Sequence, residues 1–140
     1  MGIVFIFDLD DTLLNSNSYN TYNDIKIRKN LREILEIINN NPLYIYTNGT
    51  SGHALTSLKK MGILDLFDGI FARDTVPYMK PHYLSFKYVN NIIRRIHTNH
   101  EIIFFDDMNN NIDMAENFGW CSILISKQNN IYDVFDNLLN

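Results

Sequence analysis

The chain has 140 residues, of which 46% are hydrophobic and 20% are charged, and its formal net charge is −4 with a pI near 5.4. This length suits a single domain, residues 1–140, with one adequate core, and the composition is typical of a soluble globular protein. The acidic balance excludes the general basic surface that many nucleic-acid-binding proteins carry.

The first predicted element is a buried strand at residues 3–7, an apolar run rich in β-branched and aromatic residues. Three acids follow it at once, Asp8, Asp10 and Asp11. Alternate side chains of a strand share a face, so Asp8 and Asp10 are expected to point the same way. Such a pair repels unless a cation lies between the carboxylates or one of them holds a proton. Because ligands of open α/β sheets bind outside the carboxyl ends of the strands, these acids indicate a functional site.

The rest of the chain alternates between polar loops, helical patterns and apolar runs. Residues 13–24 predict a polar loop, and apolar spacing over residues 25–39 predicts a helix with Asp24 as its N-cap. The further predictions, in chain order, are a strand at 43–46, a helix at 51–61 closed by Gly62, a short strand at 68–72, a helix from Pro81 to about His97, a strand at 102–105, a helix near 109–118 ending at Gly119, a strand at 121–125 and a helix at 130–139. This alternation predicts an α/β, Rossmann-like, doubly wound and mostly parallel sheet with helices on both faces.

Three more polar clusters follow predicted strands or begin a helix, and they are Thr47-Asn48-Gly49, Lys80-Pro81 and Asp106-Asp107. Each cluster alone has an ordinary structural explanation, such as a turn before a helix or a solvated lysine at a helix start. Two strand ends that carry acids, in order with the other two clusters, are much harder to obtain by accident. Together they indicate one site.

In these four motifs and in their order, the sequence resembles the haloacid-dehalogenase-type (HAD) phosphohydrolases over essentially the whole chain. The segments that resemble the pyrimidine 5′-nucleotidase-like branch are residues 46–54, 58–63, 66–70 and 104–107, with Asn111, Ile112 and Ala115. The resemblance implies a Mg²⁺-dependent phosphomonoesterase that works through an aspartyl-phosphate on nucleotide-like or other small phosphate monoesters.

The resemblance assigns the covalent chemistry to the first motif. It implies that Asp8 is the nucleophile that accepts the phosphoryl group, since covalent catalysis divides a hard displacement into two easier steps. Asp10 is then the general acid that protonates the leaving oxygen and later the base that activates water. Thr12, placed beside the phosphate, is expected to orient the Asp10 loop through its hydroxyl group. Asp11 stands where many relatives have glycine, although acids or asparagine also occur there.

The other motifs are implied to bind phosphate and metal. The phosphate-binding residues are Thr47, Asn48 and Gly49, at a helix N-terminus that favours anions. Lys80 is implied to be a catalytic residue that neutralises the pair of Asp8 and phosphate and keeps the nucleophile ionised. Mg²⁺ prefers oxygen ligands, and the expected ligands are the side chains of Asp8 and Asp107 and the main-chain carbonyl of Asp10, with Asp106 as an auxiliary ligand.

Three other side chains near the site have open roles. His53 follows the phosphate loop closely enough to touch a substrate, and a place on the helix surface is equally expected. Tyr19 and Tyr22 could stack on a base or ring of a substrate, or pack against the sheet.

The loops leave little room for a cap domain. Neither the loop after Leu13 nor the segment between residue 72 and Lys80 can bury a core of its own, so the chain is expected to be capless or minimally capped. An open site admits bulky substrates. The alternatives are therefore a phosphatase for a nucleic-acid end or a phosphoprotein, and a non-catalytic HAD-fold binding module. A homo-oligomer could supply the missing lid.

The sequence also allows an expectation about the cellular compartment of the protein. The first strand is too short to cross a membrane, and no basic region or cleavage signal precedes it. The single cysteine, Cys121, cannot form an internal disulfide, which fits a reducing compartment. We therefore expect a cytoplasmic protein without a membrane partner.

Overall fold

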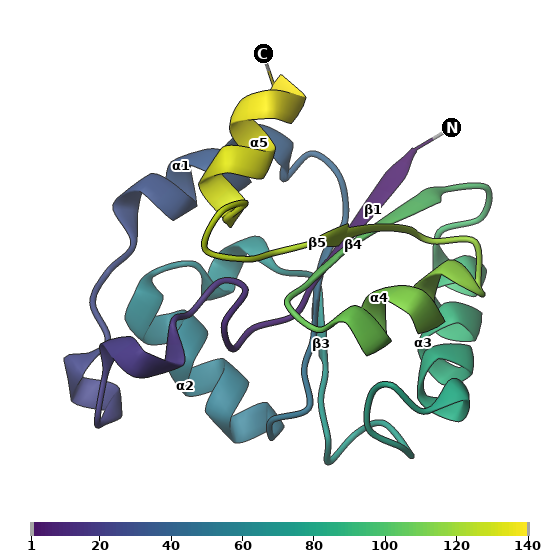
Figure 1. Cartoon of the computed structure of the whole chain (residues 1–140), viewed down its shortest axis with the longest axis horizontal. Coiled ribbons are helices and arrows are strands. Elements are labelled where there is room, and N and C mark those ends of the chain that lie inside the picture. The colour runs from purple at the N-terminus through teal and green to yellow at the C-terminus, as the bar shows by residue number, and fades with distance from the viewer. Residues whose placement is uncertain (1, 140) are drawn as a thin grey trace.

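Figure 1 shows the computed structural model, which describes residues 2–139. Five strands form one sheet in the order β3-β2-β1-β4-β5, and all neighbouring strands are parallel. The strands are β1 (Ile3–Phe7), β2 (Leu43–Tyr46), β3 (Gly69–Phe71), β4 (Glu101–Asp106) and β5 (Cys121–Leu124). The predicted α/β fold with a parallel sheet is therefore confirmed, and the strand that precedes the first acids lies at the centre of the sheet.

Helices cover both faces of the sheet. They are α1 (Lys29–Ile38), α2 (Ser51–Met61), α3 (Tyr83–Ile96), α4 (Asn109–Glu116) and α5 (Ile131–Leu139). In Figure 1, α1, α2 and α5 lie on one side of the sheet and α3 and α4 on the other. Alternation along β1 sends Phe5 and Phe7 into one core and Val4 and Ile6 into the other. None of the helices among residues 2–139 is long and apolar enough to span a membrane.

The first helix begins later than the sequence predicts. Asp24 does not cap it, because the Asp24 carboxylate accepts the backbone N–H groups of Asn20 and Thr21 and closes a short 3₁₀ turn at Tyr22–Asp24. Ile27 continues the apolar spacing of α1 but lies before the helix and is 74% exposed. The predicted start at residue 25 and the predicted N-cap are therefore wrong.

From the second strand onward, the elements follow the predicted boundaries closely. Gly62 ends α2 in the left-handed conformation, with φ of 76°, as expected of a helix-closing glycine. The helix predicted from Pro81 begins instead at Tyr83, because the His82 side chain accepts the N–H of Leu84 at 3.0 Å and serves as the N-cap. Lys80 is thereby left in the segment before the helix, where its side chain can turn inward.

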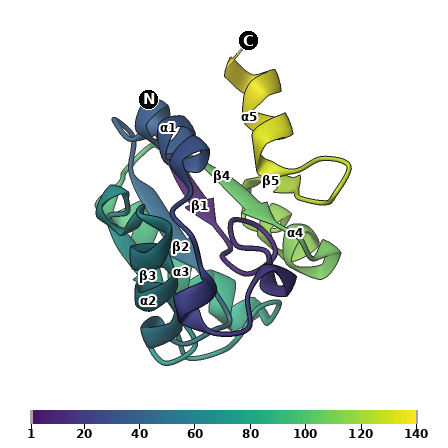
Figure 2. The same ribbon diagram turned by 90° about the vertical axis from the view of Figure 1, so that its left-hand side faces the viewer.

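The described residues contain no cap domain. The loop after β1, dark purple in Figure 2, holds only two 3₁₀ turns, Ser16–Ser18 and Tyr22–Asp24, and lies beside α2. The segment between β3 and α3 is a short loop. The carboxyl edge of the sheet is consequently covered by loops alone.

Candidate active site

Three carboxylates meet at the carboxyl ends of the two central strands. Asp8 follows β1 directly, Asp106 is the last residue of β4, and Asp107 comes next. The register pairs Phe7 with Phe105, and the Asp8 N–H donates to the Phe105 carbonyl at 2.9 Å. One carboxylate oxygen from each of the three acids lies within 4.8 Å of the others. The strand order, which places β1 beside β4, joins motifs that are far apart in the sequence.

Lys80 reaches into this group of acids, and its side chain is 1% exposed. Its Nζ donates to Asp8 Oδ1 at 3.0 Å, to Asp106 Oδ2 at 2.7 Å and to the Tyr46 carbonyl at 2.8 Å. Burial lowers the pKa of Lys80, but the two carboxylates outweigh it, so the pKa is raised overall. All three ammonium protons are in use, and Lys80 is a fixed positive charge against the predicted nucleophile.

Asn48 fixes the backbone of Lys80. Its side-chain amide donates to the Lys80 carbonyl at 3.0 Å, and its Oδ1 accepts the Lys80 N–H at 2.8 Å. This role differs from the predicted one, in which Asn48 holds phosphate, so any contact of Asn48 with phosphate would come from its backbone. The Gly49 N–H likewise donates to Thr47 Oγ1 at 3.0 Å, which leaves the Thr47 hydroxyl proton available for a phosphate oxygen.

The two adjacent acids after β4 differ in their surroundings. Asp106 is fully buried, and its oxygens accept hydrogen bonds from Lys80, from the Asn111 amide at 3.1 Å and from the Met108 N–H at 2.9 Å. Asp107 is only partly buried and lines a pocket. Asp107 is the more accessible of the two, and its assignment as the direct metal ligand with Asp106 as an auxiliary one stays a prediction.

The acid group carries more negative charge than Lys80 can balance. Burial raises the pKa of Asp8 to about 7, and Asp106 and Asp107 push it in the same direction while Lys80 opposes them. Burial also raises the pKa of Asp107. Crowded carboxylates of this kind are relieved by a cation, and Mg²⁺ takes carboxylate oxygens as its preferred protein ligands. The residues present thus fit a hard divalent cation.

We expect Mg²⁺ to raise the melting temperature, and to do so more at about pH 8 than at about pH 5.5. The pKa of Asp8 rises from 3.8 in the unfolded chain to about 7 in the folded protein, so protonation of Asp8 stabilises the folded state. This contribution to the free energy of unfolding is complete below pH 3.8 and is lost as the pH rises through about 7. Above that pH the crowded charges destabilise the metal-free protein, and below it protons compete with the metal. The apparent Kd for Mg²⁺ should rise by up to about tenfold for each pH unit below 7.

Thermal unfolding across a Mg²⁺ titration at several pH values measures this dependence. The variant Asp107→Asn should lose most of the shift and serves as the matched control. A shift in melting temperature that is independent of pH would contradict a carboxylate site for the metal.

The loop after β1 takes a shape that explains its unusual residue. Asp11 lies in the left-handed region with φ of 63°, where glycine is favoured and aspartate is among the better-tolerated alternatives. Its Oδ1 accepts the N–H of Ser16 at 2.9 Å and the Ser16 hydroxyl at 2.7 Å, which stabilises the turn. Thr12 differs from its predicted role, because its hydroxyl donates to Asp8 Oδ2 at 3.1 Å and so orients the predicted nucleophile.

Among the side chains with open roles, His53 contacts Asp10 and Tyr22 contacts His53. The His53 Nε2 is 3.0 Å and 3.1 Å from the two carboxylate oxygens of Asp10, and the Tyr22 hydroxyl is 2.7 Å from His53 Nδ1. Tyr19 packs against the core beneath the loop. His53 is therefore neither a plain surface residue nor a free substrate contact.

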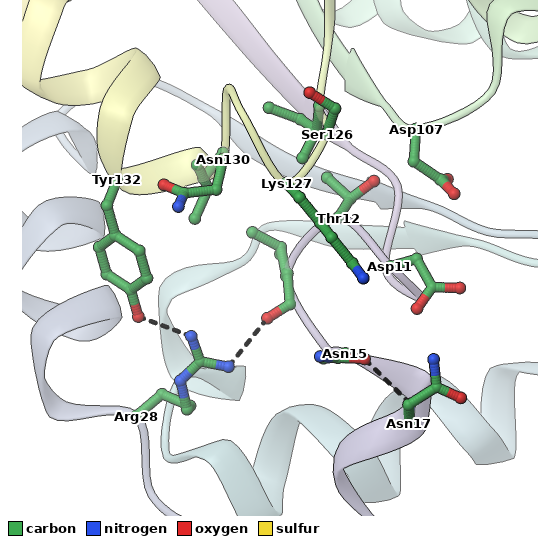
Figure 3. A pocket seen from close by; sticks show the side chains of 13 residues that line it. Asp11, Thr12, Asn15, Asn17, Arg28, Asp107, Ser126, Lys127, Asn130 and Tyr132 are labelled. Carbon is green, nitrogen blue, oxygen red and sulfur yellow. Dashed lines mark hydrogen bonds between the residues drawn. The ribbon is translucent and has the colours of Figure 1, made fainter.

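A pocket of about 630 Å³ opens beside the acids, and Figure 3 shows it from close by. Asp107 and Thr12 line one end, and Arg28 lines the other, where its guanidinium donates to the Tyr132 hydroxyl at 2.6 Å and the Leu13 carbonyl at 3.3 Å. The Lys127 side chain extends across the pocket towards Asp11 (Figure 3).

Sequence reasoning did not identify Lys127 as a site residue, and it counted Arg28 only among surface basic residues that could serve a macromolecular substrate. The position of Lys127 just after the last strand, at the carboxyl edge of the sheet, was a signal that could have found it. Arg28 carried no comparable signal, because it reaches the pocket through the fold of the loop before α1.

Solved structures with the same fold include hydrolases of several activities. The core domain of a protein described as a phosphoglycolate phosphatase, from Streptococcus pneumoniae TIGR4, is 19% identical with a TM-score of 0.68, and the match covers 100% of this chain and 97% of that one. A HAD-hydrolase from Bacillus subtilis, bound to magnesium, is 15% identical with a TM-score of 0.71 and 98% of both chains covered. The L-2-haloacid dehalogenase of Xanthobacter autotrophicus is 20% identical with a TM-score of 0.62, and the match covers 84% of this chain and 52% of the dehalogenase.

These similarities to solved structures show the fold alone, and the comparison with family models shows the family. A search of curated proteins finds no match to the sequence. Residues 18–119, more than half of the chain, match the model of the haloacid dehalogenase-like hydrolases. The chain therefore belongs to the haloacid dehalogenase-like hydrolase family.

Proposed function

We propose that this protein is a Mg²⁺-dependent phosphomonoesterase in which Asp8 forms an aspartyl-phosphate. The observation that carries the proposal is the buried Asp8 carboxylate, held by Lys80 and Thr12 beside a second pair of acids. A dehalogenase is less well supported, because displacement of a halide calls for neither a proton donor at Asp10 nor a cation site. The intact acids also argue against a non-catalytic binding module.

In the proposed reaction, an Asp8 oxygen bonds to phosphorus as the bond from phosphorus to the leaving oxygen breaks. Asp10 gives its proton to that leaving oxygen. Water then attacks the phosphorus of the aspartyl-phosphate, Asp10 takes a proton from it, and the bond to Asp8 breaks. Lys80 and the Thr47 hydroxyl stabilise charge on the phosphoryl oxygens. Mg²⁺, held by Asp8, Asp107 and the Asp10 carbonyl with Asp106 in support, supplies further neutralisation of that charge.

Small phosphate monoesters, nucleotide-like by the resemblance, are the substrates we propose. The organic part of such a substrate can be polar and anionic, because the Arg28 guanidinium contacts the uncharged Leu13 carbonyl and Tyr132, and Lys127 extends into the pocket beside Asp107. Phosphatases for a nucleic-acid end or a phosphoprotein are the second candidate, favoured by the absence of a cap domain between residues 2 and 139. A lid supplied by a second copy of the chain remains a prediction.

Truncation of Lys127 tests whether the pocket receives the substrate. We expect Lys127→Ala to raise KM about three- to tenfold with little change in kcat, because a single charged hydrogen bond contributes about 1 kcal/mol at a partly exposed site. Lys87, exposed on α3, is the matched control and should leave both constants unchanged when replaced by alanine. If KM is unchanged in the Lys127 variant for every substrate that the protein hydrolyses, the substrate binds outside this pocket.

Phosphate release from a panel of substrates tests the proposed function. The panel contains nucleoside monophosphates, sugar phosphates and 3′-phosphorylated oligonucleotides, each assayed with Mg²⁺ and with EDTA. We expect EDTA-sensitive release, and the substrate group that reacts decides between small and macromolecular substrates. A folded protein that binds Mg²⁺ and releases phosphate from none of them, nor from phosphoproteins, would overturn the proposal.

A further inference from the structure

Asp10 is held by a chain of two hydrogen-bonded side chains from separate parts of the fold. His53 Nε2 lies at nearly equal distances, 3.0 Å and 3.1 Å, from the two Asp10 oxygens. On the far side of the ring, Nδ1 lies 2.7 Å from the Tyr22 hydroxyl. The Asp10 carboxylate is 35% exposed and the His53 side chain only 20%, so the contact is partly shielded from water.

The local structure makes room for this arrangement. His53 lies in the first turn of α2, where its N–H donates to the Thr50 cap at 3.1 Å, and this fixes the ring beside the phosphate loop. A Cβ added to Gly49 would lie 3.1 Å from the His53 ring and 3.7 Å from Asp10 Oδ2. The glycine of the predicted phosphate loop thus provides the space in which ring and carboxylate meet.

On this geometry we propose that Tyr22 and His53 are positioning residues that orient the Asp10 carboxyl group towards the leaving oxygen. The inference rests on the proposed function, in which Asp10 transfers the proton. The Tyr22 hydroxyl donates to Nδ1, which leaves Nε2 to carry the ring proton and donate it to Asp10. A carboxyl group without such partners is free to rotate, and misorientation of a reacting group lowers the rate of proton transfer.

A series of leaving groups separates this role from a merely structural one. We expect His53→Leu to lower kcat/KM for an alkyl phosphate about tenfold or more, while p-nitrophenyl phosphate, whose leaving oxygen needs little protonation, is affected much less. His53→Gln, whose amide can still donate to Asp10, should recover part of the loss. Tyr22→Phe should also lower kcat/KM for the alkyl phosphate relative to p-nitrophenyl phosphate, by a smaller factor than His53→Leu. The inhibition constant for inorganic phosphate should stay unchanged in all three variants.

Failure of the inference is distinguishable from failure of the proposed function. If the wild-type protein hydrolyses both substrates in an Asp8-dependent way but His53→Leu slows both equally or neither, the positioning role is overturned and the proposed function stands. Nitrogen NMR of the His53 ring tests the contact without any activity. The proposal requires a proton on Nε2, and a neutral ring with its proton on Nδ1 would overturn it.

Discussion

Replacing Asp8 with asparagine is expected to abolish turnover while leaving the fold intact. The substitution removes the proposed nucleophile, and loss of such a group costs on the order of 10⁴-fold or more in kcat. The folded state should change by no more than about 1 kcal/mol, because the lost ion pair with Lys80 is offset by removal of a buried, crowded charge. Steady-state kinetics and urea unfolding measure the two effects side by side.

The matched control for this variant is Asp113→Asn, an exposed acid on α4, which should keep full activity. Retained turnover in Asp8→Asn would contradict the mechanism. Loss of turnover together with loss of the folded state would leave activity uninterpretable in that variant alone, so Asp8→Glu, which keeps the charge but misplaces the oxygen, is the second variant and should also be inactive.

Replacing Lys80 with methionine should cost about 3–5 kcal/mol of unfolding free energy, the largest stability effect we expect. Methionine keeps the unbranched apolar stem of the side chain but leaves Asp8 and Asp106 buried without their shared cation. Loss of the ammonium should raise the pKa of Asp8 further, so the destabilisation should be smaller at about pH 5 than at about pH 8. Urea unfolding at the two pH values measures both the size and the pH dependence.

The double variant Asp8→Asn with Lys80→Met controls for packing. It should be more stable than the sum of the single changes predicts, because it removes a charge together with its partner. Lys87→Met, on an exposed helix position, should be neutral within about 0.5 kcal/mol. Strict additivity of the two changes would show that the ion pair between Lys80 and Asp8 adds nothing to stability, and that the effect of Lys80 comes from its other contacts.

The strands and most helices could be predicted because their signals are local. Strands β1, β2 and β4 contain apolar runs that end at polar residues, and α2 is bounded by a threonine cap and by Gly62. The starts of α1 and α3 were misplaced because Asp24 and His82 satisfy neighbouring backbone N–H groups in ways that compete with the expected caps. The spacing of apolar residues does not show which of these local hydrogen bonds forms.

The sequence predicted most residues of the candidate site but not the contacts between them. The strand order β3-β2-β1-β4-β5 brings the acids together, and the alternating pattern predicted the parallel sheet but not this order. The hydrogen bonds between Asn48 and Lys80 join residues that are 32 positions apart in the sequence, and the contact between His53 and Asp10 joins residues 43 positions apart. Contacts of that range depend on tertiary packing, so the sequence indicated the residues but not that Asn48 would fix Lys80 or that His53 would reach Asp10.

The most direct test of the account is to identify the residue that carries the phosphoryl group during turnover. A substrate that releases phosphate is mixed with the protein and Mg²⁺, the reaction is quenched in acid within the first turnover, and the peptides are mapped by mass spectrometry. The account predicts a phosphoryl group on Asp8, absent when EDTA is present. A phosphoryl group on any other residue, or phosphate released with Asp8 never modified, would contradict it.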